Sequence, residues 1–206
     1  MSRLRVLLIA GVAVPILYFS TVIASSFAYP GYSHLTQYAS ELGMAGTRSA
    51  IWFNGGIFVT GLAAIAASAG IYVAARNENG GRLWPVLATV SLALFGVGLL
   101  FGALFPMPDP RHGGFGLGMG LHLTPFFLAI ALRRAEGRRR LVRYLVITAV
   151  VMLGFLAVMM GVGGLVTSAN VGLFQRVYAL ASFSWIGIAS YAFLTGRGGR
   201  SAPYRM

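Results

Sequence analysis

The chain has 206 residues, of which 57% are hydrophobic and only 10% are charged, whereas a soluble domain carries about 25% charged residues. This composition excludes an ordinary water-soluble surface, and the absence of cysteine excludes disulfides and thiolate metal sites. The formal net charge is +12, and all sixteen basic residues are arginines. Because these arginines fall in short breaks between apolar segments, they indicate membrane topology rather than nucleic-acid binding.

The apolar segments predict an all-α, polytopic membrane protein with six transmembrane helices in a single domain. The first segment, 6–27, is longer than the apolar core of about 7–15 residues in a cleavable signal peptide. We therefore expect it to be retained as a helix, with cleavage as the alternative. Further spans are expected at 51–75, 83–105, 117–132, 144–166 and 174–195, followed by a basic tail at 196–206. The fourth is short, and should recruit the glycine-rich segment before it to cross about 30 Å of hydrocarbon.

The distribution of the arginines predicts the orientation. Three lie in the loops on one side of the expected bundle, and thirteen lie on the other side, which includes both termini. The positive-inside rule places the richer side in the cytoplasm. We therefore expect a multi-pass protein of the prokaryotic cytoplasmic (inner) membrane with both termini inside. The three arginines of the extracytoplasmic side are Arg48, Arg111 and Arg176.

The loop at 28–50 carries the first group of candidate functional residues. After a Pro-Gly turn signal, the segment SHLTQYASEL reads as a short helix closed by Gly43. Such a helix would place His34, Tyr38 and Glu41 on one face, at positions i, i+4 and i+7, with Gln37 at its border. It could present His34 and Glu41 towards a site, or it could be an ordinary amphipathic helix at the membrane interface.

Two further histidines and an aspartate lie later in the chain. Asp109 and His112 flank Pro110-Arg111, and could be metal ligands or an acid–base pair, or could simply end a helix in a turn. His122 lies eleven residues before Arg133, or about 16 Å along a helix, near the middle of the bilayer. An ionisable group at that depth faces a cavity or a partner. It would serve either a function or a hydrogen bond to a neighbouring helix.

The remaining polar candidates are Asn54, near the start of the second span, and Gln175 and Arg176, in the third extracytoplasmic loop. The sequence contains none of the HExxH, GxSxG or GxxxxGK[ST] motifs. The sequence therefore leaves any metal, cofactor or protein partner unidentified.

Three segments, PGYSHLTQYASELG, FPMPDPRHGG and GLFQRVY, together resemble the bacterial and archaeal membrane family called domain of unknown function 998. The resemblance extends over about residues 8–195 and implies a six-helix integral membrane protein, without an established reaction. The family pattern often has an acidic residue where Gln175 stands, which argues against acid–base chemistry there. The pattern maps onto Pro30, Gly31, Ser40, Glu41, Leu42, Gly43, Pro106, Asp109, Gln175 and Arg176.

Two functions are compatible with these residues. The first is an enzyme with an extracytoplasmic site for a lipid or amphiphile, and we prefer it because inert packing rarely needs so many polar groups on one side. The alternative is a non-catalytic lipid-binding, assembly or accessory subunit, in which Arg176 pairs with Glu41 or Asp109. Membrane lipids are the expected partners in both cases, and nucleic acid is not. The catalytic candidates are Glu41, Asp109 and His122, and the binding candidates are His34, Asn54, His112, Gln175 and Arg176.

Overall fold

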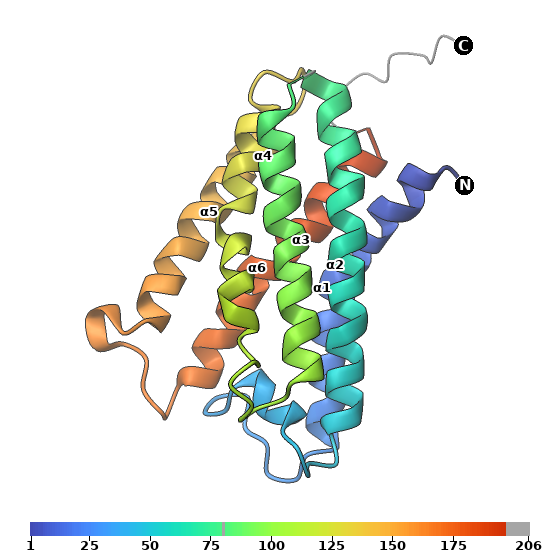
Figure 1. The fold of residues 1–206 in the computed structure, drawn as a ribbon. Helices are drawn as coiled ribbons and strands as arrows, with labels where there is room; N and C mark the ends of the chain where they lie inside the picture. Colours follow the sequence, from blue (N-terminus) through green and yellow to red (C-terminus); the bar gives the residue numbers. More distant parts are fainter. Residues whose placement is uncertain (80, 197–206) are drawn as a thin grey trace.

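The computed structural model describes residues 1–79 and 81–196, and within them all regular structure is helical. Six segments are long and apolar enough to cross a membrane (Figure 1). Two short 3-10 helices, η1 (Ala39–Gly43) and η3 (Val162–Gly164), lie in the loops. The spanning elements are α1 (Arg3–Phe27), α2 (Ala50–Asn79), α3 (Leu83–Leu104), the 3-10 helix η2 (Gly114–His122) with α4 (Thr124–Leu132), α5 (Arg139–Met159) and α6 (Val171–Leu194).

Each helix packs against the next along the chain, and α6 returns to pack against α1. In Figure 1, α6 passes obliquely behind α3 and α2 and ends near the start of α1. The middle of α6 supplies Trp185 and Ile186 to the core, and both are fully buried. The start of α6 lies among the loops at the other end of the bundle. This helix therefore connects the polar loops to the core.

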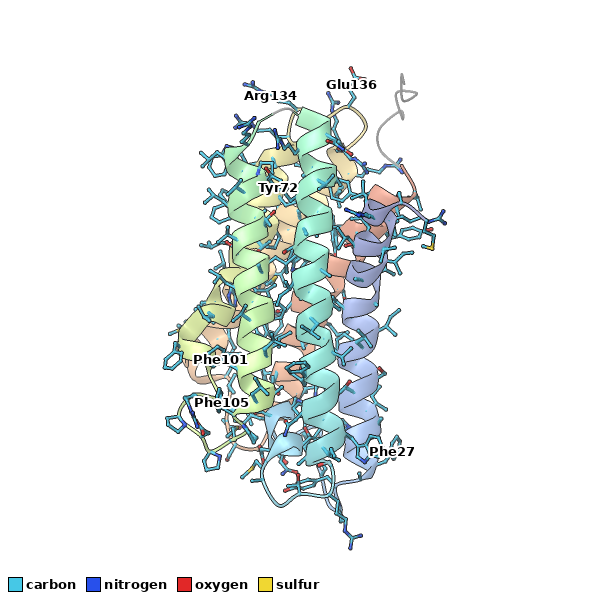
Figure 2. All side chains as sticks on the ribbon, turned by 45° about the vertical axis from the view of Figure 1, so that its right-hand side comes forward. Phe27, Tyr72, Phe101, Phe105, Arg134 and Glu136 are labelled. Carbon is cyan, nitrogen blue, oxygen red and sulfur yellow. The ribbon has the colours of Figure 1, made fainter. Side chains whose placement is uncertain are left out.

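The two ends of the bundle differ in charge. The start of α1, the α2–α3 and α4–α5 turns and the end of α6 form the arginine-rich end, where Arg134 and Glu136 are labelled in Figure 2. The loops at 28–49, 105–113 and 160–170 form the loop end, near Phe27 and Phe105 in the same view. The alternation of spans thus gathers the three loops at one end, and the first two of them hold four of the eight candidate residues.

Glycines let neighbouring segments approach through their backbones. A Cβ added to Gly61 of α2 would lie 2.8 Å from the carbonyl oxygen of Gly96 in α3, and one added to Gly96 would lie equally close to the Gly61 oxygen. The glycine-rich η2 packs on α3 in the same way, since a Cβ on Gly114 would lie 3.1 Å from the Cα of Gly98. The fourth candidate span runs from Gly114 to Leu132 and includes the glycine-rich segment before α4.

Helix α5 differs at both ends from the predicted fifth span, 144–166. Helix α5 begins at Arg139 because arginine is a good helix former, and Arg139, Arg140 and Arg143 keep their side chains exposed. It ends at Met159 because Gly161 and Gly163 adopt positive φ angles of 97° and 79°, which a continuing helix does not allow. Helix α2 also extends beyond the predicted residue 75. Of the predicted tail at 196–206, residues 197–206 lie outside the described residues.

Candidate functional site

The first loop does not form the predicted helix over SHLTQYASEL. Residues 28–38 are turns, and only η1 is helical, because the Pro30-Gly31 turn is followed by an extended residue, Tyr38, with ψ at 150°. The proposed shared face of His34, Tyr38 and Glu41 is therefore absent. Instead, Glu41 caps η1: its Oε1 accepts the backbone N–H of Tyr38 at 2.7 Å, and its Oε2 accepts Nε2 of Gln37 at 2.9 Å. Both carboxylate oxygens are thus engaged locally.

The start of α6 holds this loop in place. Oε1 of Gln175 accepts the backbone N–H of Ala39 at 2.7 Å and Nη1 of Arg176 at 2.7 Å. Nη2 of Arg176 donates to the hydroxyl of Tyr32, and also to the carbonyl of Gln37 at 3.3 Å. Among the described residues, Arg176 forms no ion pair with Glu41 or Asp109, so the predicted ion pair is wrong. Arg176 tethers the loop through neutral oxygens instead.

His34 lies at the edge of this group, with its ring edge-on to Tyr32 at a centroid distance of 5.1 Å. Partial burial, and then the positive charge of Arg176, lower the pKa of His34 from its ordinary value of 6.5. The imidazole is therefore neutral at pH 7. Protonating it at lower pH would place a second positive charge near Arg176.

In the second loop, Asp109 and Arg111 pair with each other in a two-pronged contact. Arg111 donates from Nε to Oδ1 of Asp109 at 3.0 Å and from Nη2 to Oδ2 at 2.8 Å, and its guanidinium covers the ring of Phe105. His112 turns away and donates from Nδ1 to the Phe105 carbonyl at 3.0 Å. This geometry matches the alternative in which the segment is a rigid turn. It gives no contact between Asp109 and His112 that would make them an acid–base pair.

The Asp109 carboxyl is expected to stay ionised to very low pH. Hydrogen bonds from the side chain and backbone of Arg111 lower its pKa from 3.8 to about 2. A lowered pKa means that the pairing stabilises the turn above pH 3.8 and is lost as the pH falls through about 2. Asp109 is the only aspartate in the sequence, so carbon NMR of ¹³C-aspartate-labelled protein reports on it alone. Arg111→Gln should move the titration back towards 3.8, and an unchanged midpoint would contradict the assignment.

His122 is buried, with 5% of its surface exposed, and is paired with Tyr178 of α6. The carbonyl of Met119 accepts from Nδ1 at 2.9 Å, because a carbonyl oxygen cannot donate. Nε2 forms a hydrogen bond with the Tyr178 hydroxyl. Both ring nitrogens of His122 therefore have hydrogen-bond partners. This matches the alternative in which the histidine forms a hydrogen bond to a neighbouring helix.

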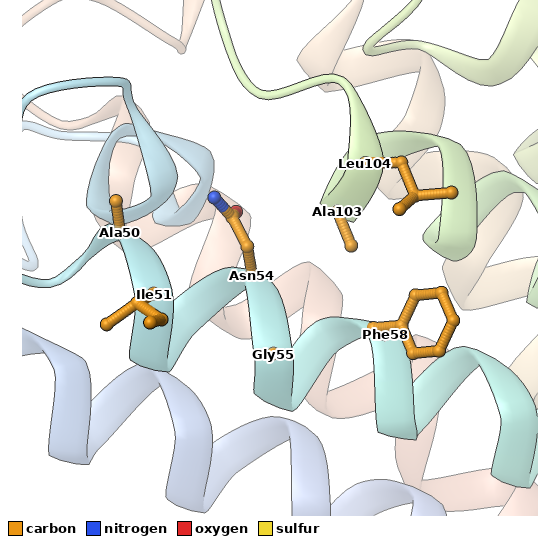
Figure 3. A pocket seen from close by; sticks show the side chains of 7 residues that line it. All are labelled: Ala50, Ile51, Asn54, Gly55, Phe58, Ala103 and Leu104. Atoms are coloured by element: carbon orange, nitrogen blue, oxygen red, sulfur yellow. The ribbon is translucent and has the colours of Figure 1, made fainter.

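Asn54 stands in an apolar groove of about 450 Å³ between the first turns of α2 and the last turn of α3 (Figure 3). Its Nδ2 donates to the carbonyl of Gly43 at 2.9 Å and so connects α2 to the end of η1. Asn54 provides the one polar side chain among the residues that line the groove: Ala50, Ile51, Asn54, Gly55, Phe58, Ala103 and Leu104.

A smaller pocket of about 180 Å³ lies under η1, where α1, α2, α3, the second loop and α6 meet. Two of the predicted residues, His112 and Gln175, line it together with Tyr18 and Ser40. Its volume is below the range of about 300–1,000 Å³ that is usual for ligand sites. The groove at Asn54 falls within that range.

The predicted site residues therefore divide into separate groups. Glu41, Gln175 and Arg176 share one hydrogen-bond network through Gln37, and Asn54 reaches the same loop at Gly43. Asp109 and His122 have their own partners elsewhere. Within the described part of the chain, no three His, Asp or Glu side chains are placed to hold a metal ion.

The sequence interpretation missed Tyr32 and Tyr178 as partners, because their contacts with Arg176 and His122 join residues far apart in the chain and have no signal in local spacing. The sequence interpretation also used the arginines of the arginine-rich end only to predict the orientation in the membrane. Arg138 is instead 3% exposed and paired with Glu78. A buried arginine within the run Arg138-Arg139-Arg140 cannot be distinguished from its exposed neighbours by sequence alone.

Six apolar spans joined by short polar loops define a multi-pass α-helical membrane protein. The chain belongs to the family described as "Protein of unknown function (DUF998)", which matches residues 12–192. No curated protein and no solved structure matches the chain significantly.

Proposed function

We propose that this protein lies in the prokaryotic cytoplasmic (inner) membrane with both termini in the cytoplasm, and that it binds a membrane lipid or another amphiphile in the α2–α3 groove at its extracytoplasmic loop end. The excess of arginines at the opposite end supports the orientation. Trp52, at the start of α2, is 70% exposed, as expected for an aromatic side chain at the membrane interface.

The observation that carries the proposal is the groove itself. It has the volume of a small-molecule site, and its walls are apolar except for Asn54. It extends along α2 from residue 50 to residue 58, which is about 12 Å of helix. In the proposed orientation this is the depth where lipid head groups meet hydrocarbon chains. An amphiphile with its chain along Phe58 and Leu104 would bring its polar part to Asn54.

The contacts of the catalytic candidates favour binding over catalysis. Both oxygens of Glu41 cap the first loop, Asp109 is paired with Arg111, and both nitrogens of His122 are engaged. A general base must reach a substrate proton, and each of these groups already has partners. We therefore prefer the non-catalytic alternative to the enzyme that the sequence alone favoured.

Filling the groove is expected to displace its ligand. A Cβ at Gly55 meets nothing within 4 Å, and Gly55→Leu adds an apolar side chain to the wall of the groove. Purified protein in nanodiscs would be cross-linked with a diazirine-labelled phospholipid, and the labelled peptides mapped by mass spectrometry. We expect labelling at residues 50–58 and 103–104 to fall about four-fold in the variant, because one displaced methylene contact contributes about 0.8 kcal/mol.

Gly154→Leu is the matched control. Gly154 is exposed on α5, and a Cβ there also meets nothing within 4 Å. This variant should leave the labelling at α2 and α3 unchanged. Uniform labelling around the whole bundle in the wild-type protein would contradict the proposal.

A further inference from the structure

The loop at 160–170 differs from the other two loops of the loop end because it carries no charge. The sequence contains no Asp, Glu, Lys, Arg or His between Arg143 and Arg176. The first part of this loop, residues 160–165 with the sequence MGVGGL, consists only of apolar side chains and glycines. We call this segment the apolar turn. Its composition is that of a membrane segment, although it is not part of a spanning helix.

The apolar turn is not covered by the rest of the described chain. Every one of its residues is exposed, and the exposed fraction is 75% for Met160, 62% for Val162 and 57% for Leu165. In Figure 1 the turn projects to the side of the bundle at the end of α5, whereas the first loop lies below the helices. Removing a side chain of this kind from water contributes about 1.5–3 kcal/mol. Water is therefore an unfavourable environment for the turn.

The length of α5 places the apolar turn at the edge of the hydrocarbon layer. Helix α5 has 21 residues and begins at Arg139, so it is about 31 Å long. The hydrocarbon layer is about 30 Å thick. Figure 1 shows α5 inclined relative to α2 and α3, so that the helix does not extend beyond this thickness. The turn thus begins where the acyl chains meet the lipid head groups.

The backbone of the loop requires a polar environment on one side. Gly161 and Gly163 have positive φ angles of 97° and 79°, and irregular backbone of this kind cannot satisfy its N–H and C=O groups in hydrocarbon. The second half of the loop is polar. Oδ1 of Asn170 accepts the N–H of Thr167 at 2.8 Å, and Nδ2 of Asn170 donates to the carbonyl of Leu165 at 3.0 Å. Asn170 therefore holds the polar half against the end of the apolar turn.

We infer that the apolar turn is a lipid-interface anchor, whose side chains insert among the acyl chains of the leaflet at the loop end while its backbone and the polar half of the loop remain with head groups and water. An interfacial position is the one that suits both the apolar side chains and the irregular backbone. Because the loop is uncharged, it requires no anionic lipid. The anchor fixes the start of α6, which holds the first loop through Gln175 and Arg176. This inference does not depend on a ligand in the α2–α3 groove.

The natural chain has no cysteine, so single-cysteine variants of the full-length protein can carry one nitroxide label each in nanodiscs of zwitterionic phospholipid. Electron paramagnetic resonance would compare collisions of the label with oxygen, which is enriched in hydrocarbon, and with a water-soluble nickel chelate. For Val162→Cys we expect oxygen collisions to dominate, as for the reference Ile147→Cys on the exposed face of α5. For the matched control Ser168→Cys, which is exposed in the polar half of the same loop, nickel collisions should dominate.

A second substitution tests whether insertion depends on the apolar side chains. Leu165→Asp in the Val162→Cys protein should shift the label towards nickel collisions, because a carboxylate at this depth is drawn to water. Ser168→Asp should leave the label at residue 162 unchanged. Equal nickel access at residues 162 and 168 in the parent proteins would mean that the turn lies in water, and would overturn the inference. Exclusion of both reagents, with dipolar coupling between labels on two copies, would also overturn it, because a second copy would then cover the turn.

Discussion

Replacing Arg138 with alanine should lower the free energy of unfolding by about 3 kcal/mol, because it leaves a carboxylate without its partner in a largely buried site. Nε of Arg138 donates to Oε1 and Oε2 of Glu78 at 2.9 and 2.8 Å, and Nη1 donates to the carbonyl of Ala192 at 2.8 Å. One side chain thus joins the ends of α2 and α6 to the start of α5. The expected loss of unfolding free energy is at the lower end of the range for breaking a buried ion pair, about 3–5 kcal/mol, because the Glu78 side chain is 22% exposed.

The measurement is reversible unfolding in mixed micelles, followed by circular dichroism. Arg139→Ala is the matched control, since Arg139 is the next residue, has the same charge and is exposed. It should change the unfolding free energy by less than about 0.5 kcal/mol. The double variant Glu78→Met with Arg138→Met should recover much of the loss, because no unpaired charge remains. Equal effects of the Arg138 and Arg139 variants would show that the ion pair contributes nothing specific.

Gly172→Ala should be comparably destabilising, by about 2 kcal/mol, although it adds a single methyl group. A Cβ at this position would lie 2.6 Å from the carbonyl oxygens of both His34 and Gln37. These are backbone atoms, so no side chain can rotate to relieve the overlap. The start of α6 would have to move away from the first loop, which stretches the 3.0 Å hydrogen bond from the Leu173 N–H to the Leu35 carbonyl.

The same unfolding assay checks this prediction, with hydrogen exchange of the first loop as a second measurement. Faster exchange at residues 33–40 is expected in Gly172→Ala. Gly154→Ala is the control, because it lies inside α5 with open space around its Cβ. It should leave stability unchanged or raise it by up to about 1 kcal/mol, since alanine favours a helix over glycine. A neutral Gly172→Ala would mean that α6 and the loop are not packed as closely as described.

Much of the fold follows from hydrophobic length. Each of the six predicted spans has a helical counterpart, and the fourth counterpart includes the glycine-rich segment before α4. The errors came where local composition misleads. The apolar run at 160–166 reads as membrane helix, but its glycines turn the chain with positive φ angles. The SHLTQYASEL segment has helical spacing, yet tethers from Gln175 and Arg176 hold it as a turn followed by η1.

For the candidate residues, the sequence predicted which end of the protein they occupy but not which of them contact one another. Sequence placed Glu41, Gln175, Arg176 and Asn54 at one end of the protein, and all four contact the first loop or belong to it. It could not show that Asp109 pairs with its own neighbour and that His122 pairs with a tyrosine 56 residues away. Ionisable side chains at the same end of a bundle share a site only when helix rotation directs them together, and rotation depends on packing.

The sequence by itself determined the class of protein, the number of spans and the asymmetry of charge, because the cost of exposing polar groups to hydrocarbon acts on each segment separately. Tertiary structure decided which polar groups meet. It buried Arg138 against Glu78, closed the first loop onto α6, and joined Asn54 of α2 to Gly43 of η1. These features arise from contacts between residues far apart in the chain, which no local pattern of residues specifies.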